Sequence, residues 1–212
     1  MAFALLGCGG GRGGDPSPLT VDLYGDSIMR GAGVQVSPAA RLREHGFVVD
    51  DYSANGLMLR SVVNGYQTPY TGAPAAEFPR GPQLPFAEVP RTARVVVIQT
   101  GVNDSLEPAD DFAANLRAAI VTAKAEGRAV VLTGVVRIPE GPVFFNADAQ
   151  PRLAANNAAT HALATEYSLQ HAGWGEAYRG AIDLHPDQIH RTQEASDRLA
   201  ALLIEAIERA DR

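Results

Sequence analysis

The chain has 212 residues, of which 46% are hydrophobic and 20% charged, a balance that indicates a folded globular protein. Its 24 Asp and Glu outnumber its 18 Lys and Arg, giving a net charge of -6, so we expect no nucleic-acid partner. A single cysteine, Cys8, excludes an intramolecular disulfide and a cysteine-based zinc cluster.

The first 18 residues are rich in glycine, and we expect them to lie outside the fold. They resemble the end of a bacterial lipoprotein signal, in which Leu-Leu-Gly precedes a lipidated cysteine, here Cys8. However, no basic residue precedes the short apolar run. Residues 1–18 are therefore either a signal remnant with a possible lipid anchor at Cys8 or a flexible leader. The first alternative predicts a protein of the bacterial cell envelope or a secreted one, and the second leaves a cytoplasmic protein open.

Residues 19–212 are expected to form one domain, which opens with a strand, a helix and a strand. The run 19–24 favours a strand that ends at Gly25. Ser37 and Pro38 are typical of a helix start, Gly46 of its end, and residues 47–49 favour the second strand.

Residues 66–90 contain many prolines and glycines with interspersed aromatic residues, and they predict a loop that covers a site. A continuous β-branched run within 94–100 then predicts a strand buried on both faces.

The remaining elements alternate between helices and strands. Helices are predicted at 110–126, 149–168 and 192–212, and strands at 129–136 and near 181–184. This alternation predicts an α/β protein with a parallel sheet covered by helices on both faces.

Polar residues follow the predicted strands where the ligand crevice of such a fold lies. They are Asp26 and Ser27 after the first strand, Asn55 and Gly56 after the second, and Asn103 after the third.

A serine hydroxyl becomes an effective nucleophile when an imidazole removes its proton and a carboxylate orients that imidazole. The sequence Asp187-Gln188-Ile189-His190 holds both groups three residues apart, so in a helix or tight turn they can meet. We therefore predict Ser27 as nucleophile, His190 as base and Asp187 as its carboxylate.

Ester hydrolysis also develops a negative oxygen that needs hydrogen-bond donors. We expect these donors to be the backbone N–H groups of Ser27 and Gly56 and the side-chain amide of Asn103, with Asn55 as an alternative to Gly56.

Other interpretations of the same residues compete with these roles. Asp187 could cap a helix, with His190 a surface imidazole, and His185 with Asp183 forms a rival acid–base pair. Asp26 and Asp104 are expected to bond nearby backbone N–H groups. Trp174 and Tyr178, with the aromatic residues of 66–90, could line an acyl pocket or pack as a lid.

In this order, Gly-Asp-Ser-Ile, a loop glycine, Gly-Val-Asn-Asp and Asp-Gln-Ile-His resemble the sequence blocks of the SGNH (GDSL-like) hydrolases over residues 20–198. The resemblance implies a flavodoxin-like three-layer α/β/α sandwich. It implies the same roles for the five site residues: Ser27, Gly56, Asn103, Asp187 and His190. The block that holds Gly56, Ser-Ala-Asn-Gly-Leu-Met-Leu, departs from the polar and glycine pattern that many members show.

The sequence thus predicts a serine esterase that works without metal or cofactor, acting on small-molecule or carbohydrate esters with short acyl or acetyl groups. The alternative is a non-catalytic carbohydrate-binding or envelope-interaction module that retains the fold. The motifs of α/β-hydrolase elbows, phosphate loops and dinucleotide folds are missing from the sequence. Oligomeric state is not predicted.

Overall fold

The computed structural model describes residues 17–66, 83–108, 111–142 and 144–212. Residues 1–16 of the predicted leader, which include Cys8, and most of the predicted covering loop lie outside these residues. Among the described residues, the α-helices and strands are β1 (Thr20–Gly25), α1 (Ser27–Arg30), α2 (Pro38–Glu44), β2 (Val48–Asp51), α3 (Leu59–Asn64), β3 (Val95–Gln99), α4 (Phe112–Ala125), β4 (Ala129–Leu132), α5 (Ala149–Glu166), β5 (Gln170–His171) and α6 (Gln193–Ala210).

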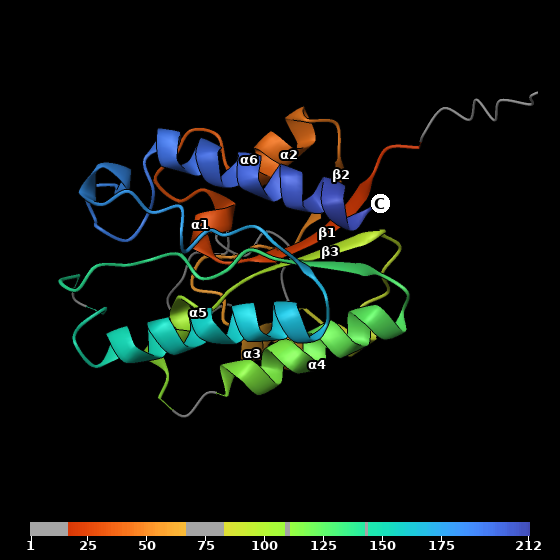
Figure 1. Cartoon of the computed structure of the whole chain (residues 1–212), viewed down its shortest axis with the longest axis horizontal. Helices are drawn as coiled ribbons and strands as arrows, with labels where there is room; N and C mark the ends of the chain where they lie inside the picture. Colours follow the sequence, from red (N-terminus) through yellow and green to blue (C-terminus); the bar gives the residue numbers. More distant parts are fainter. Residues whose placement is uncertain (1–16, 67–82, 109–110, 143) are drawn as a thin grey trace, which may run out of the picture.

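The strands form one parallel sheet in the order β2-β1-β3-β4-β5. This is the doubly wound order of flavodoxin-like folds, and it confirms the predicted fold class. Helices α1, α2 and α6 cover one face, and α3, α4 and α5 cover the other (Figure 1).

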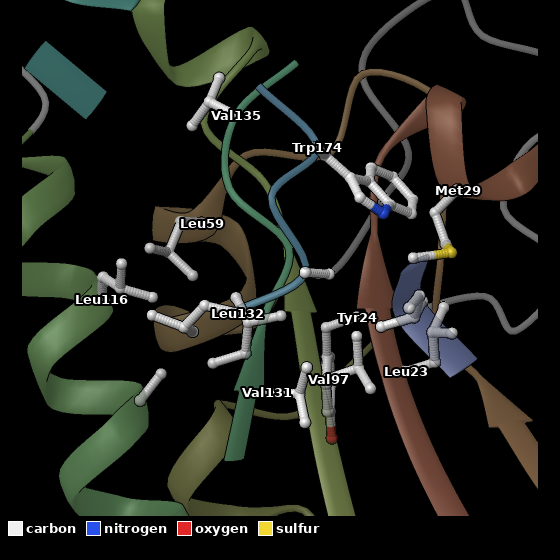
Figure 2. Close-up of a cluster of buried hydrophobic side chains, with 14 of the residues drawn as sticks. Leu23, Tyr24, Met29, Leu59, Val97, Leu116, Val131, Leu132, Val135 and Trp174 are labelled. Atoms are coloured by element: carbon white, nitrogen blue, oxygen red, sulfur yellow. The ribbon is translucent and has the colours of Figure 1, made fainter. Parts of the chain in front are cut away.

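Two of the interior strands, β1 and β3, are buried because helices cover the sheet on both sides. All five residues of β3 are buried, and so is β1 from Val21 to Gly25. Side chains of α3 and α4, such as Leu59 and Leu116, pack with strand residues such as Val97 in this core (Figure 2). Each fully buried aliphatic side chain contributes roughly 1.5–3 kcal/mol, so the sheet is a firm support for the loops at its end.

Strand register aligns the loops that follow the strands. Gly25 at the end of β1 pairs with Gln99 at the end of β3, and Ile98 pairs with Leu132 at the end of β4. The segments that begin at 26, 100 and 133 therefore leave the same edge of the sheet side by side.

One predicted strand is wrong. Residues 181–184 contain a short 3₁₀ helix, η4 (Ala181–Asp183), and the fifth strand is β5, which has only two residues. The Asp183 carboxylate accepts a hydrogen bond from the Arg179 N–H, which closes the segment into a turn instead of a strand. The fourth strand is also shorter than predicted: the backbone bonds to its neighbours continue only to Thr133, and Gly134, at φ +80°, leaves the extended conformation.

Of the predicted loop at 66–90, the described part holds a bridge between Tyr66 and Gln83 and a 3₁₀ helix, η2 (Phe86–Glu88). The prediction that this loop covers a site concerns mainly residues 67–82, which lie outside the described residues. Within the described ranges, no helix combines the length and apolar character that crossing a bilayer requires.

Candidate active site

Ser27 is the first residue of α1 and is separated from the end of β1 by Asp26 alone. Asp26 caps this helix, because its Oδ1 accepts the Ile28 N–H at 2.8 Å. The Asp26 N–H in turn donates to the backbone and side-chain oxygens of Gln99, at 3.2 and 3.0 Å. The predicted structural role of Asp26 is confirmed by these bonds, which fix Ser27 relative to both central strands.

His190 and Asp187 lie in a tight loop between η4 and α6. The ends of the loop are joined by a bridge between Leu184 and Arg191. Asp187 Oδ1 accepts the N–H groups of Ile189 and His190, each at 2.9 Å, so the carboxylate organises its own turn. The side chains face each other because of this turn, and not because of a helix.

The three side chains form a continuous hydrogen-bonded chain. Ser27 Oγ lies 2.9 Å from His190 Nε2, and His190 Nδ1 lies 2.7 Å from Asp187 Oδ2. The residues are brought together across 163 positions of sequence. In this arrangement His190 Nε2 can accept the serine proton while Nδ1–H donates to the carboxylate.

The pKa values of two carboxyl groups near His190 are shifted in opposite directions. Burial alone would raise the pKa of Asp187, but hydrogen bonds from His190 and from two backbone N–H groups hold this pKa well below its usual range. The carboxylate therefore stays ionised beside the imidazole. Burial raises the pKa of Asp26 to about 6, although its hydrogen bonds and the nearby His190 and Arg191 limit the rise.

Asn103 and the loop that holds Gly56 are in contact. The Asn103 side-chain amide donates to Leu57 O at 3.2 Å. Asp104 strengthens the link, since its two carboxylate oxygens accept the N–H groups of Leu59 and Gly101 at 2.7 and 2.8 Å, as predicted for a structural aspartate. The donors predicted from the second and third loops thus belong to one hydrogen-bonded unit. A methyl group added at Gly56 would meet nothing within 4 Å, so open space adjoins this residue.

The rival acid–base pair of His185 and Asp183 is wrong. Asp183 is buried, accepts the Arg179 N–H at 2.7 Å and forms an ion pair with Arg198 at 2.7 Å. His185 instead turns toward Asp187, with Nδ1 at 3.2 Å from its Oδ2.

Sequence reasoning missed two residues that hold the site loops. Arg191 is 4% exposed, and its guanidinium donates to Ile189 O at 3.0 Å and to Arg137 O at 2.6 Å. Asn156 in α5 donates to Gly101 O at 2.9 Å. An arginine after a histidine and an asparagine in a helix are usually exposed, so no sequence signal marked either residue.

Beside the His190 loop lies a cavity of about 430 Å³. Its walls come from the segment after β4, from the first half of α5 and from Tyr178, and they include Val136, Ile138 and Leu153. The Arg191 guanidinium joins this wall to the loop, because it bonds Arg137 O and lies 5.7 Å from the centre of the Tyr178 ring. Of the two predicted pocket aromatics, Tyr178 lines the cavity, whereas Trp174 is buried and donates to Leu199 O at 2.9 Å.

Among the described residues, one group has metal-ligand types close together, namely His161, His171 and Glu176. Its geometry does not suit a metal ion. The rings of His161 and His171 stack on each other at 4.1 Å between centroids. His171 Nδ1 accepts the Gly173 N–H at 3.1 Å, which leaves the ring proton on Nε2. This group is better described as a hydrogen-bonded cluster in which His161 binds Glu176 at 2.9 Å.

The chain was compared with known protein families, with curated sequences and with solved structures. The model of the GDSL-like lipase/acylhydrolase family matches residues 23–198. No curated protein sequence matches the chain.

Solved structures similar to this one include three bacterial proteins. A protein of Slackia heliotrinireducens proposed to be an SGNH hydrolase has a TM-score of 0.66 and 18% identity, covering 90% of this chain and all of its own. A lipolytic G-D-S-L family protein from Veillonella parvula has a TM-score of 0.64 and 17% identity over 91% of this chain and 100% of its own. A variant of an acetyl xylan esterase from Geobacillus stearothermophilus has a TM-score of 0.63 and 16% identity over 90% and 95%. At these identities the likeness concerns the fold.

Proposed function

Because this chain belongs to the GDSL-like lipase/acylhydrolase family, we propose that it is a serine esterase in which Ser27 is the nucleophile. The observation that carries the proposal is the continuous contact from Ser27 Oγ through the His190 ring to Asp187 Oδ2, at 2.9 and 2.7 Å. A weak nucleophile, a base and an ionised orienting group are what acyl transfer to serine requires.

The proposed reaction has two halves. Ser27 Oγ attacks the ester carbonyl carbon while its proton moves to His190 Nε2, and the tetrahedral intermediate collapses when His190 returns that proton to the departing alcohol. Water then attacks the acyl-serine, giving its proton to His190, and the carboxylic acid leaves as Ser27 regains the proton. Asp187 stays ionised throughout and stabilises the imidazolium.

The negative oxygen of each intermediate is held by the N–H groups of Ser27 and Gly56 and the amide of Asn103. The contact between Asn103 and the Gly56–Leu57 loop supports this proposal, because it brings two of the three donors from separate loops together. Donors of this kind contribute roughly 3–4 kcal/mol each to the transition state.

We propose short acyl or acetylated carbohydrate esters as substrates. The cavity beside the His190 loop has about the volume of a small-ligand site, 430 Å³. The amide of Gln150 at its wall already donates to Ile138 O and Phe145 O, which leaves mainly apolar contacts and the Tyr178 ring for a bound group. Such a wall suits an acyl group or the face of a sugar ring.

The test uses p-nitrophenyl esters from acetate to long chains, an acetylated oligosaccharide and a fluorophosphonate probe. We expect the native protein to hydrolyse short esters and to be labelled once per chain, and Ser27→Ala to do neither. Ser168→Ala is the matched control, since this exposed serine lies two residues before β5 and so at the opposite edge of the sheet. Equal hydrolysis or labelling of the native protein and Ser27→Ala would exclude Ser27 as the nucleophile, and a native protein that neither hydrolyses esters nor is labelled would favour a non-catalytic module.

A further inference from the structure

The loop that carries His190 forms few hydrogen bonds with the rest of the chain. Its residues, 185–191, bond mostly to one another. Among the described residues, two hydrogen bonds lead out of this segment. One is the contact between His190 Nε2 and Ser27 Oγ, and the other runs from the Arg191 side chain to Arg137 O. Apart from the contact with Ser27, the loop is therefore linked by hydrogen bonding through Arg191.

The Arg191 guanidinium connects two segments of the chain. Its Nη1 donates to Ile189 O at 3.0 Å, inside the loop, and its Nη2 donates to Arg137 O at 2.6 Å, in the segment after β4. Arg191 is buried, and its guanidinium lies 5.7 Å from the centre of the Tyr178 ring. Because a guanidinium presents its donors in a rigid plane, the two carbonyl groups are held at a fixed separation. The residue next to His190 thus ties the loop to residue 137.

Ser27 and His190 are in this way positioned from two neighbouring strands of one sheet. Ser27 is fixed through the hydrogen bonds of Asp26 to the end of β3. Arg137 belongs to the segment after β4, which pairs with β3. Side chains are held precisely when their supports belong to rigid elements, so the bond from Arg191 to Arg137 O gives the loop the same frame that Ser27 has.

The charge of Arg191 is buried, and among the described residues it has no carboxylate within ion-pair distance; its hydrogen bonds go to backbone carbonyls. Burial lowers the pKa of Arg191 to about 10, while Tyr178, Asp183 and Asp26 limit the fall, so the group stays charged at neutral pH. Hydrogen bonds from a charged donor are roughly twice as strong as neutral ones. An apolar side chain would avoid the cost of burying a charge, so the two bonds are what an arginine adds here.

We propose that Arg191 is a positioning residue that holds the His190 ring within hydrogen-bonding distance of Ser27. The proposal rests on the esterase function proposed above. Without the guanidinium, the loop keeps its internal bonds, including the contact between His190 and Asp187, but loses its link to the segment after β4. The ring then spends less time at the 2.9 Å separation from Ser27 Oγ that proton transfer requires.

The test measures kcat and KM for p-nitrophenyl acetate in two variants of Arg191. Arg191→Met removes both donors, and kcat should fall by about 10²-fold, the cost of displacing a reacting group by roughly 1 Å. KM should change little, because the lost bonds act on the base and not on the bound ester. Arg191→Lys keeps the charge but not the planar pair of donors, so its kcat should also fall, whereas a role of the charge alone would preserve it.

Arg91→Met is the matched control. Arg91 is also buried, donates to a backbone carbonyl, Phe86 O, and has its guanidinium 3.9 Å from the centre of an aromatic ring, that of Phe86. It precedes β3 and so lies at the opposite end of the sheet from the site. Arg91→Met should lose stability in urea unfolding but keep the native kcat. A native kcat in either Arg191 variant, or equal losses of kcat in Arg191→Met and Arg91→Met, would overturn the proposal.

Amide hydrogen exchange of residues 185–191 measures the link without turnover. Exchange in this segment should be about tenfold faster in Arg191→Met than in native protein, and unchanged in Arg91→Met, because only the first frees the loop. Arg191→Lys serves both measurements if Arg191→Met does not fold. If native protein hydrolyses no ester while exchange still accelerates, the esterase function fails and the link through Arg191 stands. Native exchange rates in a folded Arg191 variant would refute the link itself.

Discussion

At the scale of single residues, the site combines an ionised carboxylate near the surface with a buried one. Asp187 is 38% exposed in its side chain and oriented by three hydrogen bonds, whereas Asp26 is fully buried behind Ser27. Asp26 has His190 and Arg191 nearby as positive or potentially positive groups. When ionised, the buried carboxylate therefore adds negative potential beside the His190 ring, and burying its charge costs stability.

This cost predicts a pH-dependent effect of Asp26→Asn. The pKa of Asp26 rises from 3.8 to about 6 on folding, so the folded state holds its proton more tightly and loses stability as pH rises from about 4 to 6. The asparagine cannot ionise. The free energy of unfolding of the variant relative to native protein should therefore rise between pH 4 and pH 7, by up to about 3 kcal/mol.

Urea unfolding at a series of pH values measures this difference, and any constant cost of the new amide cancels from it. A difference that stays flat with pH would show that Asp26 is not held neutral by burial.

A second prediction concerns the donors for the negative oxygen. Asn103→Ala should lower kcat for p-nitrophenyl acetate by about 10²–10³-fold with little change in KM, because the amide bonds the oxygen only as charge develops. Steady-state kinetics give the split between kcat and KM. An equal loss in Asn115→Ala, a residue of α4 outside the site, would point to a general loss of folding instead.

The sequence allowed Asp187 and His190 to be paired because a spacing of three residues limits where two side chains can lie. Ser27 was selected because it follows a predicted strand. It did not allow the neighbours of that group to be assigned. Asp183 and His185 are also close in sequence, two residues apart, yet after the turn at 181–183 Asp183 pairs with Arg198 and His185 lies near Asp187. Arg191 could not be placed, because its partners are backbone carbonyls that any sequence would supply.

At the scale of elements, the loop after β3 contains a position, Gly101, where both the backbone angle and the lack of room for a side chain require glycine. Gly101 has φ +111°, and an added methyl carbon would lie 2.6 Å from Val135 Cγ2 and 3.1 Å from the Phe112 ring. These contacts come from the segment after β4 and from α4. The loop that contains Asn103 is therefore packed tightly against these two elements.

Gly101→Ala should accordingly destabilise the protein by several kcal/mol and lower activity, since relief of the clash moves the Asn103 loop. The control is Gly127→Ala, at φ +75° with nothing within 4 Å of the added carbon, which should cost only about 1 kcal/mol. Thermal unfolding of both variants provides the comparison. Equal losses would show that the packing around residue 101 yields easily.

The predictions of helices and strands were correct where the apolar pattern is long. They were wrong or missing where pairing with distant residues determines the secondary structure. The central strands and the helices α4, α5 and α6 follow from their patterns. β5 could not be predicted, because two residues, Gln170 and His171, carry no strand pattern and are held by pairing with β4. Helix α3 was also missed; its six residues are too few for a clear helical period.

At the scale of the whole molecule, Trp174 joins the last strand to the last helix. It is the only tryptophan of the chain, it is 1% exposed, and its indole N–H donates to Leu199 O in α6 at 2.9 Å. Figure 2 shows its ring among the core side chains. Its fluorescence thus reports on the contact between sheet and helix layer.

We expect the loss of native tryptophan fluorescence and the loss of far-ultraviolet circular dichroism to coincide in urea, because one core connects both helix layers through the sheet. A tryptophan transition that precedes the loss of helix signal would indicate that α6 detaches first. The overall architecture was predictable for the same reason: one alternating pattern generates one sheet.

The two border strands of the sheet, β2 and β5, are short. β2 has four residues and ends in Asp50 and Asp51, and β5 has two. An exposed edge strand can pair with a strand of another chain. A short edge strand with negatively charged residues pairs poorly in this way. The fold therefore carries built-in resistance to ordered aggregation, and dilution from denaturant should return monodisperse protein instead of fibrils.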